Sequence, residues 1–251
     1  MLSDCLIEIG TEELPPRALR SLSQNFAAIM QRALGDHDLA PGAVEVFATP
    51  RRLALLLRDT PSRQADQVVE KRGPALAAAF DGDGNPSRAA LGFAGSCGVE
   101  LDQLERRETD KGSWLYFCST QAGKSLQELL PQLLAAALAE LPIPKRMRWG
   151  DRSDEFVRPV KWLLLMIDSE VVDTELFGLR SGNRSFGHRF HAPTSLEIGS
   201  PGEYEETLLS QGMVIASFEH RRDSIRKLVE EAAARVGGSA HIEDDLLDEV
   251  T

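Results

Sequence analysis

Basic and ring-bearing side chains are concentrated between residues 145 and 191, on both sides of an apolar run at 162–167. Arginine forks bind phosphate oxygens, and tryptophan or histidine rings stack on unpaired bases, so this density indicates contact with a polyanion such as an RNA. Gly178, Gly182 and Gly187 indicate tight turns or close approach of the backbone to a partner. The candidates for RNA or subunit contact, including two arginines that follow Pro50, are Arg51, Arg52, Lys145, Arg146, Arg148, Trp149, Arg158, Arg184, His188, Arg189 and His191.

These residues also have structural interpretations that the sequence leaves open. Arginines at strand ends pair with carboxylates of their own chain, and the net charge of −11 at pH 7 supplies many carboxylates. Arg51 and Arg52 would then form surface salt bridges after the proline turn. Trp149 either stacks on a base or ribose or packs into the core, whereas Trp162, inside its apolar run, is expected in the core.

Other spacings suggest catalysis or metal binding only weakly. Glu12 and Glu13 stand just before a predicted helix, where we favour an electrostatic role at the helix start over acid–base work. His188 and His191 lack cysteine or carboxylate partners in register for a metal site. The DGDGN stretch at 81–85 is predicted to be a turn, because a calcium-binding loop would need a glutamate where Gly92 stands. We therefore assign no catalytic residue and no metal ligand; motifs for nucleotide phosphates, hydrolase elbows and zinc peptidases are missing from the sequence.

Length and composition describe a chain that can bury a full core. The chain has 251 residues, 42% apolar and 27% charged, which is typical of soluble globular proteins. No window approaches the ~18 apolar residues that a membrane span needs. The N-terminus is acidic rather than basic, unlike a secretory signal, and three widely spaced cysteines indicate free thiols, so we expect a cytoplasmic protein. Within 145–191, nine Lys and Arg face seven Asp and Glu, so this segment is basic inside an acidic chain.

Hydrophobic periodicity predicts alternating strands and amphipathic helices, giving an α/β or α+β fold: a mixed sheet with flanking amphipathic helices. The predicted strands cover 5–9, 45–49, 52–57, 113–118 and a buried central strand at 162–167, and the predicted helices cover 15–34, 87–96, 125–141, 203–210 and 218–236. Residues 60–98 are otherwise expected to be irregular. We divide the chain into an N-terminal β-α-β segment at 1–60, an irregular and helical segment with a strand and a capped helix at 61–144, a central strand and basic-loop segment with its closing helix at 145–238, and the start of a further domain at 239–251.

Seven stretches together resemble the N-terminal part of the β subunit of bacterial heterotetrameric glycyl-tRNA synthetase. They occur in the order and at the approximate spacing of that family over nearly the whole chain, which makes the match specific although each stretch alone is weak. The stretches are LIEIGTEELPPRAL (6–19), ATPRRLALLL (48–57), KRGP (71–74), GNPSRAALGFAGSCGV (84–99), PKRMRWG (144–150), FVRPVKWLLLMI (156–167) and SGNRSFGHRFH (181–191).

The resemblance implies an assembly of two α and two β subunits that joins glycine to its tRNA at the expense of ATP. In that family the α subunit holds the active site with ATP and magnesium, so we expect this region to bind no cofactor and to carry no catalytic residue. The implied partners are the α subunit, a second β subunit and tRNA(Gly). The family's β subunit continues into a helical domain and an anticodon-binding domain, so we expect the chain to be an N-terminal fragment.

Two functions of other classes compete with tRNA binding. In the first, this region is a pure scaffold: its helices at 126–141 and 218–236 dock other domains or the α subunit, and its basic loops stabilise the fold without contacting RNA. In the second, it is a metal-dependent hydrolase that uses His188, His191 and the pair Glu12 and Glu13, which would require stoichiometric metal in the purified protein.

Overall fold

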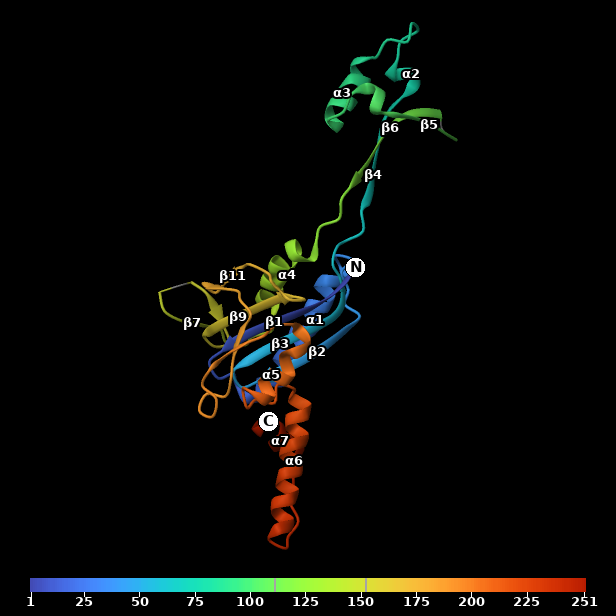
Figure 1. Cartoon of the computed structure of the whole chain (residues 1–251). Helices are drawn as coiled ribbons and strands as arrows, with labels where there is room; N and C mark the ends of the chain where they lie inside the picture. The colour runs from blue at the N-terminus through green and yellow to red at the C-terminus, as the bar shows by residue number, and fades with distance from the viewer. Residues whose placement is uncertain (111, 152) are drawn as a thin grey trace. The chain divides into compact units, whose positions relative to one another are not determined.

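The computed structural model describes residues 1–110, 112–151 and 153–251, which form two compact units. Unit 1 combines Met1–Gln64 with Ser125–Thr251, and unit 2 is Ala65–Lys124, an insertion within unit 1 (Figure 1). The two ends of the insertion meet, since the Leu126 amide donates to the Ser62 carbonyl over 2.9 Å. The contacts thus group the chain differently from the four consecutive segments expected, because the chain leaves unit 1 and returns to it.

A five-stranded sheet in the order β10-β9-β1-β3-β2 forms the centre of unit 1, and each ladder in it is antiparallel. Its strands are β1 (Leu2–Thr11), β2 (Ala43–Thr49), β3 (Arg52–Pro61), β9 (Val160–Ile167) and β10 (Glu170–Val171). This confirms a mixed helix and strand fold and favours α+β. The apolar run at 162–167 is a buried strand as predicted, but the middle strand is β1. Ile7 pairs with Leu55 on one side and with Leu165 on the other.

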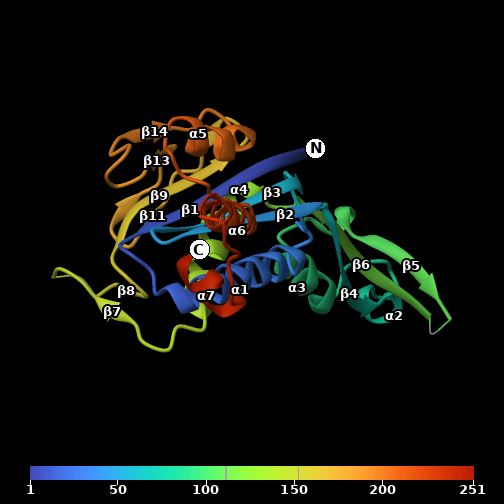
Figure 2. The same ribbon diagram turned by 90° about the horizontal axis from the view of Figure 1, so that it is seen from below.

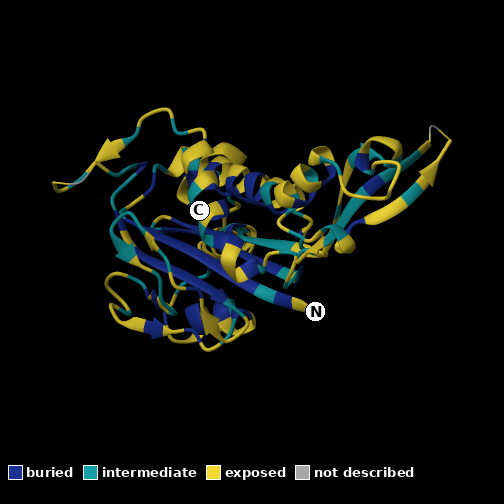
Figure 3. Cartoon of the chain, turned by 90° about the horizontal axis from the view of Figure 1, so that it is seen from above, coloured by how far each residue is buried: buried dark blue, intermediate teal, exposed yellow. Residues whose placement is uncertain are grey.

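Both faces of this sheet are covered, which is why β1 is buried over most of its length (Figure 3). Residues Cys5, Ile7 and Ile9 face helices α1 (Pro16–Gly35) and α4 (Leu126–Glu140). Leu6 faces the opposite side, with Leu196 and Tyr204. The elements on that side are the ribbon of β13 (Arg184–Phe186) with β14 (Ser195–Glu197), and helix α5 (Tyr204–Ser210). Figure 2 shows α1 and the β13–β14 ribbon on opposite sides of the sheet.

The two long helices on the α1 face form where their apolar periodicity predicts them. In α1 the residues Leu19, Leu22, Phe26 and Met30 recur at helical spacing and are buried. Helix α4 starts with the predicted capping box, in which Ser125 and Glu128 satisfy each other's backbone amides. The helix continues through its internal proline, so this proline does not set its start.

Unit 2 is a three-stranded antiparallel sheet in the order β4-β6-β5, with short helices on Leu115 and its neighbours. Its elements are β4 (Gln67–Ala75), α2 (Leu76–Ala79), α3 (Arg88–Cys97), a 3-10 helix (Leu101–Gln103), β5 (Glu105–Thr109) and β6 (Gly112–Gln121). The expectation of irregular structure over 60–98 was wrong for β4. That strand is mostly exposed, so it is formed by pairing with β6 and leaves little apolar periodicity. Asp81 accepts the amides of Asp83 and Asn85, which confirms the predicted turn.

The rest of unit 1 consists of short ribbons and three helical segments. These elements are β7 (Met147–Arg148), β8 (Glu155–Phe156), β11 (Glu175–Leu176), β12 (Leu179–Arg180), a 3-10 helix (Pro201–Glu203), α6 (Phe218–Arg235) and α7 (Asp244–Val250). Helix α6 extends away from the sheet, and Leu228 and Val229 on its apolar face are 62% and 41% exposed. Ion pairs hold α7, including Arg20–Asp248 at 3.0 Å and Arg222–Asp244 at 2.7 Å. Across the described residues, every helix is too short or too polar to cross a membrane.

Candidate nucleic-acid interface

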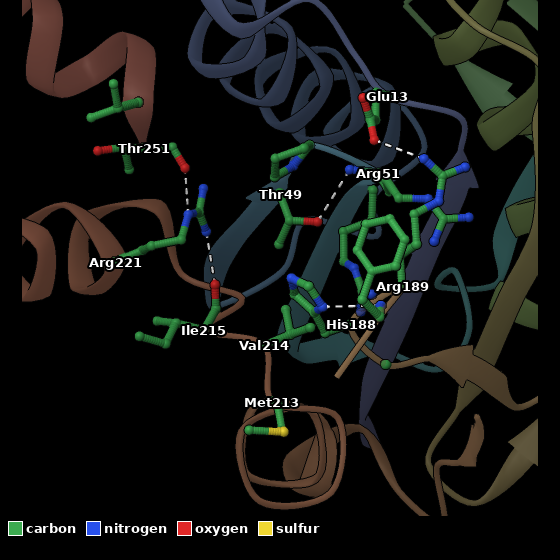
Figure 4. Close-up of a pocket in the computed structure, with 15 residues that line it drawn as sticks. Glu13, Thr49, Arg51, His188, Arg189, Met213, Val214, Ile215, Arg221 and Thr251 are labelled. Atoms are coloured by element: carbon green, nitrogen blue, oxygen red, sulfur yellow. Dashed lines mark hydrogen bonds and ion pairs between the residues drawn. The ribbon is translucent and has the colours of Figure 1, made fainter. Parts of the chain in front are cut away.

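A cavity of about 440 Å³ lies in unit 1, between parts of the chain that are far apart in sequence (Figure 4). Its walls come from the turn before β3, the loop after β13, the segment between α5 and α6, the first turn of α6 and the end of α7. In the close-up, Arg189 and Arg221 stand on opposite sides of the cavity. The basic side chains on its walls are Arg51, Arg52, His188, Arg189 and Arg221.

Beneath the cavity lies a buried polar network centred on Glu8. Trp162 Nε1 donates to Glu8 Oε1 over 2.6 Å, and Ser185 Oγ donates to the same oxygen over 2.8 Å. Arg52 Nη1 lies 3.7 Å from Glu8 Oε1 and donates to Ser185 Oγ over 3.2 Å. Burial, with Glu8 adding its negative charge, raises the pKa of Tyr204 well above the usual tyrosine value. Because Ser185 belongs to β13, this network holds β13 and the loop that follows it onto the sheet.

The structure places Arg52 inside the protein, which corrects its expected position on the surface. The residue is 2% exposed, and besides Ser185 its side chain binds the Phe186 carbonyl. The reason is its position in β3, opposite Gly10 of β1, on the sheet face that β13 covers. Arg52 therefore supports the loop after β13 and is too deeply buried to meet an RNA itself.

Gly10 makes room for this arrangement. A Cβ atom built on Gly10 would lie 1.9 Å from ring carbons of Trp162, so the indole packs directly on the glycine backbone. The sequence interpretation missed Glu8, Gly10 and Ser185. One signal was available: alternation in LIEIG places the Glu8 carboxylate on the same sheet face as Leu6, inside a strand that is otherwise apolar.

Arg51 is the cation at the cavity with the fewest partners. It is half-buried, its guanidinium lies 5.7 Å from the Trp162 ring centre, and its Nε meets no hydrogen-bond acceptor among the described residues. Arg189, in contrast, pairs with Glu13 at 2.9 Å and with Glu12 at 3.4 Å. Positive charge from Arg51 is therefore available to a bound anion, while Arg189 is held in a set position.

Glu12 and Glu13 serve this loop rather than the start of α1. No acidic residue lies in the first turn of α1, whose N-cap is Pro15, so the favoured electrostatic role at the helix start was wrong. Glu12 additionally pairs with Lys161 at 3.3 Å. The carboxylates were assigned to the helix because they precede it in sequence, whereas β1 places them beside the loop after β13.

The two candidate histidines belong to the same loop. His188 Nδ1 accepts the backbone amides of Phe190 and His191, each over 3.2 Å, so this ring nitrogen stabilises the turn. The His188 and His191 rings lie 4.5 Å apart between centres. In the described parts of the chain, no three His, Cys, Asp or Glu residues cluster in a way that could hold a metal ion.

Arg221 adds a cation that the sequence interpretation did not single out. It donates to three backbone carbonyls, those of Ala48 and Ile215 at 2.8 and 2.7 Å and that of Thr251. Burial and the charge of Arg52 lower its pKa to about 10. Its three acceptors are carbonyl oxygens, and no carboxylate side chain among the described residues pairs with it. In the sequence, Arg221 is one basic residue in the first turn of a helix, and nothing local distinguishes it.

The other candidates lie elsewhere in unit 1. Arg146 binds the carbonyls of Ala139 and Leu141 at the end of α4, and Arg148 pairs with Glu155 at 2.6 Å. Lys145 is exposed, and Arg184 is exposed on β13 opposite Glu197. Trp149 is half-buried and packs against the core near Phe177. Arg158 donates to the carbonyls of Glu13 and Val157. The structure thus brings Arg51, Arg52, His188 and Arg189 together at the cavity, with His191 beside His188 and Arg158 bonded to the Glu13 carbonyl, and it places the other candidates elsewhere.

Comparison with known proteins gives one consistent result. Residues 5–251 match the family model described as glycyl-tRNA synthetase beta subunit. Over 249 residues the chain is 51% identical to the glycine–tRNA ligase beta subunit of Marinobacter nauticus, covering 99% of this chain and 36% of that protein. It is 49% identical over 247 residues to the protein of the same name from Hahella chejuensis, with 98% and 36% covered. The matches cover nearly the whole chain, and the chain spans about a third of the length of these relatives. The chain therefore belongs to the glycyl-tRNA synthetase beta subunit family.

Proposed function

We propose that this region supports the ATP- and magnesium-dependent attachment of glycine to tRNA by binding tRNA at the Arg51 cavity, with the active site on the α subunit. The observation that carries the proposal is the half-buried Arg51, whose guanidinium pairs with no carboxylate among the described residues and lines the cavity together with Arg189 and Arg221. A guanidinium in this setting matches a phosphate group, which offers several acceptor oxygens. The names of the relatives support tRNA as the source of that phosphate.

The charge of the whole chain shapes how such binding would work. At a net charge of −11 the surface as a whole repels RNA, so affinity must come from close contacts at a local basic site. Each phosphate that such a site neutralises releases condensed counterions and steepens the salt dependence of binding by roughly 0.7–0.9 in logarithmic slope. A site with two or three arginine contacts therefore predicts a salt slope of about −2.

A titration with tRNA(Gly) at two salt concentrations tests the proposal, with a tRNA of another specificity measured alongside. Arg51→Gln should weaken binding and reduce the magnitude of the salt slope by close to one. The matched control is Arg180→Gln, because Arg180 is an exposed arginine paired with Asp173 on the separate β11–β12 ribbon. Absence of tRNA binding at low salt, or equal losses in both variants, would contradict the proposal and favour a scaffold without RNA contact.

A second function, assembly with the α subunit, is favoured by helix α6. Its apolar face, with Leu228 and Val229 exposed and Val236 85% exposed beyond its end, has the pattern of a helix that packs against a partner. The apolar face of α4 cannot serve in this way, since Leu130 and Leu134 are fully buried in unit 1, which corrects that part of the scaffold hypothesis. The implied assembly with two α and two β subunits remains part of this proposal.

Co-purification with the α subunit tests the assembly role. Leu228→Glu should reduce recovery of the α subunit without changing the stability of this chain, because the side chain is already exposed. Leu91→Glu, at a leucine that is 53% exposed on α3 of unit 2, provides the control. Unchanged recovery with Leu228→Glu would place the contact elsewhere.

A further inference from the structure

A second recess, of about 330 Å³, adjoins the first cavity. Arg51, Gly187 and Arg189 line both of them, so the two guanidinium groups stand where the recesses meet. Gly187 contributes only backbone there. A Cβ on it would lie 2.3 Å from the Ala192 carbonyl oxygen, so the loop is tightly packed at this point.

Each recess has aromatic side chains next to its arginines: the Arg189 guanidinium lies 6.0 Å from the Phe190 ring centre, and that of Arg51 lies 5.7 Å from the Trp162 ring centre. In the first, Phe190 is 79% exposed and Met213 is 60% exposed, so both present apolar surface to the recess. In the second, the wall consists of Phe186, Trp162 and Pro193, and Lys161 adds a positive charge. Phe186 is 36% exposed, and Trp162, which is only 7% exposed, packs against it with the ring centres 4.9 Å apart.

Because each recess has an aromatic wall and the two recesses share Arg51 and Arg189, we propose that they bind two consecutive unpaired nucleotides of a single-stranded RNA segment. The phosphate that joins the two nucleotides would lie on Arg51 and Arg189. Ring surfaces bind bases by stacking, and guanidinium groups bind the phosphate between them. The inference rests on the proposed function, since it names the kind of RNA segment that the Arg51 cavity accepts. A base inside a duplex cannot offer its face to Phe190, so the site selects unpaired nucleotides.

The known contacts of the loop fit this role. Glu12 and Glu13 hold the Arg189 guanidinium in position, so little side-chain entropy is lost when a phosphate binds. Arg51 pairs with neither of these carboxylates, so its positive charge is available to the phosphate. Stacking on Phe190 tolerates any base, so the site recognises the unpaired state rather than a particular sequence.

Fluorescence anisotropy with a labelled hexauridylate tests the inference on the 251-residue protein. The hexamer should bind at low salt and should compete with tRNA, whereas a blunt RNA duplex of equal charge and uridine monophosphate should compete poorly. Phe190→Ala should weaken hexamer binding roughly tenfold and Phe190→Tyr should preserve it, because stacking needs only the ring. The exposed position of Phe190 leaves the fold unaffected by either change, which thermal unfolding verifies.

Four results would overturn the inference, and they differ in what else they affect. If tRNA binds but the duplex competes as well as the hexamer, or if Phe190→Ala binds like the wild type, single-strand recognition fails while tRNA binding stands. If uridine monophosphate competes as well as the hexamer, the site holds one nucleotide and the pairing of recesses fails. If neither tRNA nor hexamer binds at low salt, both this inference and the proposed function fail.

Discussion

Removing the charge of Glu8 should destabilise unit 1 more than its small chemical change suggests. Glu8→Gln keeps the shape of the side chain but leaves Arg52, 2% exposed, 3.7 Å from a neutral amide. Breaking a buried ion pair at one partner costs about 3–5 kcal/mol, because the remaining charge stays out of water. The amide also replaces a strong acceptor for the donors of Trp162 and Ser185. For a folding unit of 150–250 residues, a loss near 4 kcal/mol lowers the Tm by roughly 8–16 °C.

The assay is a double-mutant cycle measured by urea unfolding. Glu8→Gln and Arg52→Met are compared singly and together, following tryptophan fluorescence. If the unpaired buried charge causes the loss, Arg52→Met should recover much of the stability in the Glu8→Gln background, giving a coupling of about 2 kcal/mol or more. Strictly additive losses, or a single-variant loss below about 1 kcal/mol, would refute the argument that the pair is electrostatically coupled.

Three further predictions concern other parts of the molecule. Gly10→Ala should destabilise by more than about 3 kcal/mol in denaturant unfolding, because its Cβ would meet the Trp162 ring, whereas Gly35→Ala, with open space around it, should be neutral. Burial raises the pKa of Cys5 to about 12, so at pH 8 a thiol reagent should label the half-buried Cys97 in the native protein, Cys118 more slowly because burial also raises its pKa, and Cys5 only after unfolding. Hydrogen bonds from Arg222 and then Arg226 lower the pKa of Asp244 below 3.8, so its support of α7 is present above that pH and is lost as pH falls further. The protection of the 244–250 amides, taken as the exchange rate relative to the intrinsic rate at each pH, should fall below about pH 4, and Asp244→Asn should show the lower protection already at pH 7.

Elements with strong local signals could be predicted from the sequence. The periodic leucines of α4 and its Ser125 cap predict a helix without knowledge of the fold, and the apolar run at 162–167 predicts a buried strand. Strand β4 could not be predicted in this way, because its polar residues follow from pairing with β6 rather than from burial. For the same reason the insertion of unit 2 was not apparent from the sequence. Whether a strand pairs within unit 1 or within unit 2 does not change the amino-acid composition of that stretch.

The candidate site was predicted in part. Four of the candidate side chains line one cavity, but the meeting of Glu8 with Arg52 depends on the register of β1 against β3, which composition does not contain. Arg148 was expected with the others because it is close to them in sequence. Instead, it belongs to the separate β7–β8 ribbon, where it pairs with Glu155. Proximity along the chain was therefore a poor guide to proximity in space for the basic residues.

The backbone hydrogen bond between Ser62 and Leu126 joins the two chain segments of unit 1 that flank unit 2, so this point of the chain can accept an insertion. A chain without residues 65–124 would need only a short turn to link β3 to α4, and the register of the five-stranded sheet would remain as it is. The entropy of closing such a connection grows slowly with its length, so the host unit can carry a long or a short excursion at similar cost. Evolution can therefore exchange, enlarge or delete unit 2 at this insertion point without changing the fold of unit 1, and a protein engineer can insert a foreign domain at the same point.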